Sequence, residues 1–217
     1  MIELVDIEKT YPGKQGRIHV LRGVTATFHR GDSIGILGQN GAGKSTLLRI
    51  MCGSEAASFG TVRRQAACSW PLGFSGSFAS SLTGAENLRF VCRIYGADIA
   101  EVTDFVSDFS ELGPSMNEPV KTYSTGMRSR LAFALSMAVR FQVYVIDEAL
   151  ASGDVAFQRK AIKIFEERRA GSDVIMVSHS IDMIKQYCTK AGVLNGGKLT
   201  MYDTIDEANE NYLRALS

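Results

Sequence analysis

The sequence predicts an α/β fold, in which strands buried on both faces alternate with helices. Segments 143–148 and 173–178 are each built on a continuous apolar run, which is typical of the central strands of a parallel sheet. A third apolar run, 33–37, is followed by a glycine-rich loop and then by a helical pattern from residue 47. With 217 residues, 45% of them apolar, the chain can bury one large core. We therefore expect one domain with a subdomain.

The glycine-rich loop has the composition of a phosphate-binding loop. Its glycines let the backbone adopt positive φ and turn N–H groups towards phosphate oxygens. Lys44 can place a positive charge beside the β- and γ-phosphates, and Ser45 can offer its hydroxyl to Mg²⁺. The following helix directs its N-terminal dipole at the same anion. The predicted nucleotide-binding residues are Gly38, Gln39, Asn40, Gly41, Ala42, Gly43, Lys44, Ser45 and Thr46.

The overall composition argues against several classes of protein. The chain has 24 basic and 23 acidic residues, and this balance gives no indication of a nucleic-acid partner. Its four cysteines are scattered, which predicts buried thiols in a reducing compartment. The first residues do not resemble a signal peptide, and no run approaches the roughly 18 apolar residues of a membrane span. We expect a cytosolic protein, and these observations are compatible with a partner in the membrane.

The N-terminal region has the pattern of antiparallel strands. Segments 2–7 and 19–28 alternate apolar and polar residues and are separated by a turn that contains Pro and Gly. Segments 60–62 and 67–69 predict two more short strands. Tyr11 lies near the tip of the predicted hairpin, where an aromatic ring either packs on its neighbours or stacks on a purine.

The middle of the chain is predominantly helical in pattern. Residues 71–82 are rich in Gly and Ser and carry aromatic residues, which predicts a loop with a docking surface. Thr83 and Glu86 have the spacing of a capping box, so a helix is expected to begin there, and a second is expected at 99–112. We expect a helical subdomain at about 75–140, without the heptads of a coiled coil.

Another apolar helix is expected at 131–139. Ser124 and Gly126 lie just before it, where a serine is typical both of an ordinary N-cap and of an anion-binding site. On local evidence the N-cap is the simpler interpretation. Arg128 and Arg130 are expected to be solvated residues of the same helix.

Two carboxylates end the apolar strand at 143–148. In open α/β sheets, the carboxyl ends of the strands face the crevice in which ligands bind. Asp147 is therefore expected to bind Mg²⁺, and Glu148 to orient or deprotonate an attacking water. His179 follows the strand at 173–178, and on its own it would be a structural residue.

The C-terminal part predicts a turn, two helices and a hairpin. The turn at 151–154 ends with Asp154. A charged amphipathic helix is expected at 157–169 and a last helix at 205–216. Two adjacent glycines separate two short apolar segments at 191–202, which predicts a hairpin between them.

Taken in order, these motifs resemble the nucleotide-binding subunit of an ABC (ATP-binding cassette) transporter over the whole chain. The resemblance implies an α/β P-loop NTPase core with a mixed sheet, an N-terminal antiparallel β subdomain and a helical subdomain. Residues 1–217 would then form a single nucleotide-binding domain that binds ATP and Mg²⁺. Tyr11 looks like the adenine-stacking aromatic, and residues 38–46 look like the Walker A motif.

The resemblance also assigns roles to the later motifs. Asp147 and Glu148 correspond to Walker B, Asp154 to the D-loop, and His179 to the switch histidine. The metal would be held by Ser45 and Asp147, and the implied catalytic residues are Lys44, Glu148 and His179. The signature motif, which acts on the nucleotide of a second copy, corresponds to Ser124, Thr125, Gly126 and Met127.

Departures from the family pattern point to one of its branches. The usual signature is Leu-Ser-Gly-Gly-Gln, whereas Tyr123, Thr125 and Met127 replace its leucine, first glycine and glutamine. The Q-loop glutamine, expected near residues 73–75, is absent. The motifs Ser-Trp-Pro-Leu-Gly, Tyr-Ser-Thr-Gly-Met-Arg and Val-Ser-His-Ser look like those of capsular polysaccharide exporters. Relatives that export O-antigen, teichoic acid or other cargo are the alternative.

The implied mechanism needs a second copy of the chain. In a head-to-tail dimer, Ser124 of one copy would close over the γ-phosphate bound to the other. ATP closes the dimer and hydrolysis opens it. A separate membrane permease would hold the protein at the inner face of the cell membrane. The predicted permease contacts are Trp70, Phe74 and Phe78.

The sequence disfavours four other functional classes. DNA-maintenance ABC ATPases carry a long coiled-coil insertion, and translation-associated ABC proteins normally carry two cassettes. A P-loop GTPase would have an Asn-Lys-x-Asp motif, which does not occur here. A non-catalytic subunit is disfavoured because Lys44, Glu148 and His179 are all present.

Overall fold

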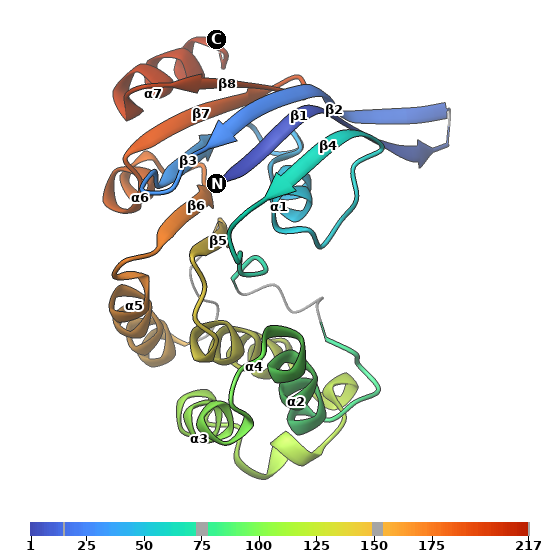
Figure 1. Ribbon diagram of the computed structural model, residues 1–217, viewed down its shortest axis with the longest axis vertical. Coiled ribbons are helices and arrows are strands. Elements are labelled where there is room, and N and C mark those ends of the chain that lie inside the picture. The colour runs from blue at the N-terminus through green and yellow to red at the C-terminus, as the bar shows by residue number, and fades with distance from the viewer. Residues whose placement is uncertain (15, 73–77, 149–153, 217) are drawn as a thin grey trace. The chain divides into compact units, whose positions relative to one another are not determined.

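The computed structural model describes residues 1–14, 16–72, 78–148 and 154–216 (Figure 1). The chain divides into two compact units, which are considered separately below. The first contains Met1–Pro71, Gln142–Glu148 and Gly171–Ser217. The second contains Leu72–Phe141 and Ala149–Ala170. The second unit thus includes the helical subdomain expected at about 75–140, together with residues 149–170.

The first unit begins with an antiparallel sheet, as the alternating patterns predict. Its strand order is β2-β1-β4, and its strands are β1 (Ile2–Gly13), β2 (Gly16–Phe28) and β4 (Phe59–Arg64). The hairpin strands are longer than expected. Tyr11 pairs with Ile18 inside the ladder, so it lies within a strand near the tip and not in the turn.

The second sheet of this unit is mixed. Its order is β5-β6-β3-β7-β8, in which the first four strands are parallel and β8 is antiparallel to β7. The carboxyl ends of β3, β6 and β5 therefore share one edge. Its strands are β3 (Ile34–Leu37), β5 (Val143–Asp147), β6 (Asp173–Val177), β7 (Lys190–Asn195) and β8 (Lys198–Tyr202). The helices of this unit are α1 (Lys44–Cys52), α6 (Ile181–Tyr187) and α7 (Ile205–Arg214).

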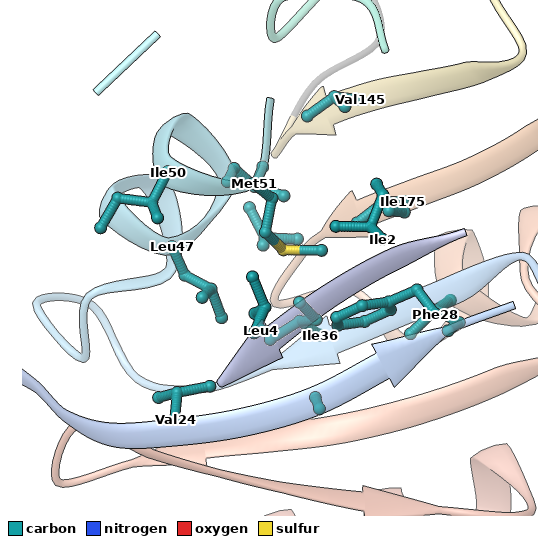
Figure 2. Close-up of a cluster of buried hydrophobic side chains, with 14 of the residues drawn as sticks. Ile2, Leu4, Val24, Phe28, Ile36, Leu47, Ile50, Met51, Val145 and Ile175 are labelled. Atoms are coloured by element: carbon teal, nitrogen blue, oxygen red, sulfur yellow. The ribbon is translucent and has the colours of Figure 1, made fainter. Parts of the chain in front are cut away.

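The main core of the first unit joins its two sheets to α1. Figure 2 shows Leu4 and Phe28 of the antiparallel sheet beside Ile36 of β3 and Met51 of α1. Ile36 and Met51 are fully buried. Burial of an aliphatic or aromatic side chain stabilises a fold by about 1.5–3 kcal/mol. This core therefore fixes α1, which begins at the glycine-rich loop, against the strand that precedes the loop.

The regular elements in the described part of the second unit are helices. They are α2 (Gly84–Tyr95), α3 (Ile99–Ser110), η2 (Gly113–Asn117), η3 (Val120–Thr122), α4 (Thr125–Ala138) and α5 (Val155–Arg169). The predicted capping box at the start of α2 is present, because the Thr83 hydroxyl accepts from the Glu86 N–H at 3.1 Å and the Glu86 carboxylate accepts from the Thr83 N–H at 2.8 Å. Phe109 of α3 packs its ring on Phe133 of α4 and Phe157 of α5, with centroids 5.8 and 5.5 Å away.

Candidate nucleotide-binding site

The glycine-rich loop joins β3 to α1 with the conformation that its composition predicts. Gly43 has φ 99° and forms the N-cap of α1, so its N-terminal N–H groups have no side-chain cap among the described residues. Gly38 is required for a different reason: a Cβ there would lie 2.6 Å from the Leu194 carbonyl oxygen. The loop can thus present backbone N–H groups and a helix dipole to an anion.

Lys44 is the first residue of α1, and only 5% of it is exposed. Its ammonium group donates to the carbonyl oxygens of Gly38 at 2.8 Å and Gln39 at 3.1 Å. The Glu148 carboxylate lies 4.0 Å away. The loop therefore holds this buried positive charge in place, beside the carboxylate of Glu148, which follows β5 directly.

Ser45 and Asp147 meet although they are 102 residues apart. The Ser45 hydroxyl donates to Asp147 Oδ1 at 3.0 Å. Burial raises the pKa of Asp147 and the negative charge of Glu148 adds to this, whereas the hydrogen bond from Ser45 opposes it. A hydroxyl and a carboxylate at the edge of a phosphate site fit Mg²⁺, which is held by one or two protein oxygens together with substrate phosphates. Among the described residues no group of three or more His, Cys, Asp and Glu could hold a metal alone.

Glu148 has a strained backbone. Its φ of 64° lies in the left-handed region, which an L side chain rarely adopts. Its N–H donates to the Val177 carbonyl at 2.9 Å, so pairing with β6 holds it in this conformation. About half of its side chain is exposed. Strain of this kind is concentrated at functional sites, where it directs a side chain to a required position.

These residues surround one cavity of about 560 Å³. The cavity joins the glycine-rich loop to the carboxylates of Walker B. It is lined by Val20, Asn40, Gly41, Gly43, Lys44, Ser45, Thr46, Asp147 and Glu148. Val20 of β2 was not predicted, because only the packing of the hairpin places it 2.8 Å from the position of a Gly43 Cβ.

Tyr11 and His179 are not among the described residues that line this cavity. The Tyr11 hydroxyl donates to the Glu55 carboxylate, and the Lys9 ammonium lies 5.0 Å from the centre of its ring. His179 is exposed and follows β6, at the same sheet edge as Asp147 and Glu148. The roles predicted for Tyr11 and His179 stay predictions.

In the second unit, Ser124 is the N-cap of α4. Its hydroxyl accepts from the Met127 N–H at 3.2 Å, and Ser124, Thr125 and Gly126 are all exposed. Tyr123, which stands in place of the usual leucine, is buried and donates its hydroxyl to the Ser115 carbonyl at 2.5 Å. The buried tyrosine thus anchors an exposed helix N-terminus.

Asp154 caps α5 by accepting from the Phe157 N–H at 2.9 Å. It also forms an ion pair with Arg130 of α4 at 2.5 Å, and Arg130 forms a second pair with Glu111 at 2.8 Å. The Arg130 guanidinium lies 4.8 Å from the centre of the Phe157 ring. The expectation that Arg130 is a solvated residue was wrong, because its guanidinium pairs with two carboxylates and packs on an aromatic ring, all from outside its own helix.

The predicted permease contacts have different outcomes. Trp70 is only 9% exposed, which argues against a direct contact of its side chain with a permease. Phe78 is half-buried, and Phe74 lies outside the described residues. Within the parts of the chain that the structure describes, no helix is long and apolar enough to cross a membrane.

The cavity defines the protein as one with a P-loop nucleotide site, and comparison with known proteins identifies the family. Residues 21–151 match the ABC transporter family. The match covers more than half of the chain, which therefore belongs to the ABC transporter family. As a member of it, the chain is an ATP-binding ATPase.

Curated relatives match nearly the whole chain. The capsule polysaccharide export ATP-binding protein CtrD of Neisseria meningitidis serogroup B is 48% identical over 212 residues, which are 98% of each chain. The ATP-binding protein BexA of Haemophilus influenzae is 47% identical with the same coverage. The polysialic acid transport ATP-binding protein KpsT of Escherichia coli is 45% identical over the full length of both chains.

Solved structures confirm the predicted fold. The ATP-binding subunit of an ABC transporter aligns over 100% of both chains with a TM-score of 0.74 and 21% identity. A dimeric ATP-binding cassette in a post-hydrolysis state, bound to ADP and Pi, covers 94% of this chain and 98% of its own with a TM-score of 0.71 and 20% identity. Both are α/β cassettes with the architecture described above.

Proposed function

We propose that this chain is the ATP-hydrolysing subunit of an ABC transporter that exports a capsular or other cell-surface polysaccharide across the inner membrane. The observation that carries the proposal is the 48% identity to a capsule polysaccharide export ATP-binding protein over 98% of both chains. Teichoic acid export proteins TagH of Staphylococcus are 36% identical, and the match covers only 76% of their length. O-antigen, teichoic acid or another cargo is therefore the second candidate.

The cavity supports ATP hydrolysis by this chain. Lys44, held by two loop carbonyls, would bind the β- and γ-phosphates. Bound Mg²⁺ would neutralise charge that develops on the phosphates, and Ser45 and Asp147 would hold it. Glu148 lies at the rim of the cavity, with its carboxylate available to take a proton from the attacking water. His179, at the same sheet edge, would stabilise the transition state.

The start of α4, which carries the signature residues, supports a head-to-tail dimer as the active form. Ser124, Thr125 and Gly126 are exposed at the N-terminus of a 14-residue helix, and Met127 follows in its first turn. An exposed helix N-terminus favours a negative charge. In the dimer it would close over the γ-phosphate held by Lys44 of the other copy. A related cassette of the same fold is dimeric.

The trans arrangement can be tested by pairing variants. Lys44→Ala disables the phosphate loop, and Ser124→Arg disables the signature. If the signature acts in trans, a dimer with one variant in each copy retains one intact site and about half of the ATPase activity. A dimer with both variants in one copy and none in the other has no intact site. The opposite pattern would show that Ser124 acts within its own chain.

A separate permease would bring the protein to the inner face of the cell membrane as a peripheral cytoplasmic subunit. Phe78 is the remaining described candidate for this contact, because it is only half-buried. Phe78→Asp should leave basal ATPase activity intact and reduce export. Deleting the gene should leave polysaccharide inside the cell, and Lys44→Ala should not restore its export. Surface polysaccharide at the normal level in the deletion strain would rule out the proposed cargo.

A further inference from the structure

A compact polar cluster lies outside the cavity, around Glu55. The Tyr11 hydroxyl and the Lys9 ammonium, 2.8 Å away, both contact Oε1 of Glu55. The Arg49 Nε donates to Oε2 at 2.9 Å. Burial disfavours the charged form, but hydrogen bonds from Lys9, Tyr11 and Arg49 outweigh it and lower the pKa of Glu55 to about 2. The carboxylate is therefore ionised at any physiological pH.

This cluster reaches the nucleotide cavity along two routes. Arg49, on α1, also donates from Nη2 to the Thr46 hydroxyl at 3.3 Å, and Thr46 lines the cavity. On the other side, Tyr11 pairs with Ile18, which precedes the cavity residue Val20 by two positions on β2. Two residues of a strand span about 7 Å. The contacts of Arg49 and Glu55 thus connect Thr46 of the phosphate loop to the Tyr11 ring, which lies closer than Val20 to the tip of the hairpin.

The ring of Tyr11 is constrained on three sides. Its hydroxyl is bound to Glu55, its strand is paired to Ile18, and the Lys9 ammonium lies over the ring. Lys9 is itself held by the Ala56 carbonyl at 2.7 Å. A ring fixed in advance loses less conformational freedom when a planar ligand stacks on it. In the role predicted for Tyr11, that planar ligand is the purine base of an ATP whose phosphates lie in the cavity.

We propose that Glu55 is a positioning residue of the nucleotide site, which holds the Tyr11 ring for the base of ATP and connects it through Arg49 to Thr46. The inference rests on the proposed function and on the role of Tyr11 as the adenine platform. Lys9 occupies one face of the ring, so the base stacks on the other face. No atom of Glu55 needs to contact the nucleotide.

The test compares Glu55→Gln with Tyr11→Phe, which each weaken the same hydrogen bond and preserve side-chain size. Each should raise the KM for ATP about fivefold, which is the size of a typical net hydrogen-bond contribution, and change kcat less than twofold. The double variant should be no worse than the more affected single variant, because both act on the same hydrogen bond between Tyr11 and Glu55. Binding of inorganic tripolyphosphate, which has no base, should be unchanged in all three. Glu3→Gln is the matched control, since Glu3 pairs with Arg63 at 3.2 Å in the same sheet.

Tyr11→Ala separates failure of this inference from failure of its premise. If Tyr11→Ala leaves the KM for ATP unchanged, Tyr11 is not the base platform and the role of Glu55 is refuted with it. If Tyr11→Ala raises the KM but Glu55→Gln and Tyr11→Phe do not, only the inference about Glu55 is refuted. A parallel loss of tripolyphosphate binding in Glu55→Gln would also refute it, because the damage would then extend to the phosphate loop. ATPase activity that survives Lys44→Ala would instead overturn the proposed function.

Discussion

The left-handed backbone of Glu148 leads to a prediction in which stability and activity respond differently. In the middle of a helix or strand, glycine is less stable than alanine by about 0.5–1 kcal/mol because it loses more conformational entropy on folding. At φ 64° an L side chain instead costs about 1–2 kcal/mol relative to glycine. The two effects leave Glu148→Gly more stable than Glu148→Ala by about 0.5–1 kcal/mol. Both variants lose the contact with Lys44, so their difference isolates the backbone.

Thermal unfolding and ATPase assays of the same preparations measure both effects. For a chain of this length, the difference corresponds to a Tm about 2 °C higher for Glu148→Gly. Glu148→Ala, Glu148→Gly and Glu148→Gln should all lower kcat by about 100-fold or more, because each removes the general base. Glu148→Gln should in addition accumulate an ATP-bound dimer. An alanine variant at least as stable as the glycine variant would refute the strained conformation, and retained turnover would refute the role of the carboxylate.

Three further outcomes follow from individual contacts. Ser45→Ala removes the hydroxyl that faces Asp147 and should raise the Mg²⁺ concentration for half-maximal ATPase activity about tenfold, measured by titration after chelation. Glu55 has a lowered pKa, so it stabilises the fold above pH 4.5 and this contribution is lost as the pH falls towards 2. Glu55→Gln should therefore unfold more easily by about 2 kcal/mol at pH 7 in urea, and the difference from wild type should disappear near pH 2. Tyr123→Phe leaves the Ser115 carbonyl without its donor and should cost about 1 kcal/mol in urea unfolding, with little change in ATPase activity.

The parts of the site that the sequence predicts are those fixed by short-range spacing and by sheet geometry. Lys44 and Ser45 follow the glycine loop directly, and Asp147 and Glu148 end a buried strand. Because parallel strands bring their carboxyl ends to one edge, the Ser45–Asp147 contact could be expected without knowing the strand order.

The parts that could not be predicted depend on which charged side chains meet across long separations. Glu55 bonds to Tyr11 from 44 residues away, and many other acids in the chain have the same local appearance. Trp70 shows a different failure. Its Gly- and Ser-rich surroundings indicate an exposed loop, whereas the adjacent Ser69 donates its N–H to Val143 at 2.9 Å and accepts from the Val145 N–H. These two hydrogen bonds hold Ser69, and with it the neighbouring Trp70, beside β5.

At the start of α4, the fold requires glycine at neither of the two signature positions where the family usually has one. Thr125 opens the helix at a position where a side chain is tolerated, which explains why the usual first glycine can be absent. Gly126 also has room for a side chain, since among the described residues a Cβ there would meet only the Ser124 hydroxyl, at 3.9 Å. The fold has room for alanine, and Gly126→Ala should stabilise α4 by up to about 1 kcal/mol.

In the proposed head-to-tail dimer, the open space beside Gly126 is where the nucleotide of the other copy would lie. We therefore expect Gly126→Ala to raise the Tm and to lower ATPase activity at least tenfold, because its methyl group would lie where the γ-phosphate of the other copy approaches. Gly84→Ala is the contrasting variant. Its Cβ would lie 2.5 Å from the Tyr123 hydroxyl, so it should lower stability first. Full activity in Gly126→Ala, or a loss of its stability, would show that the exposed start of α4 does not face a nucleotide.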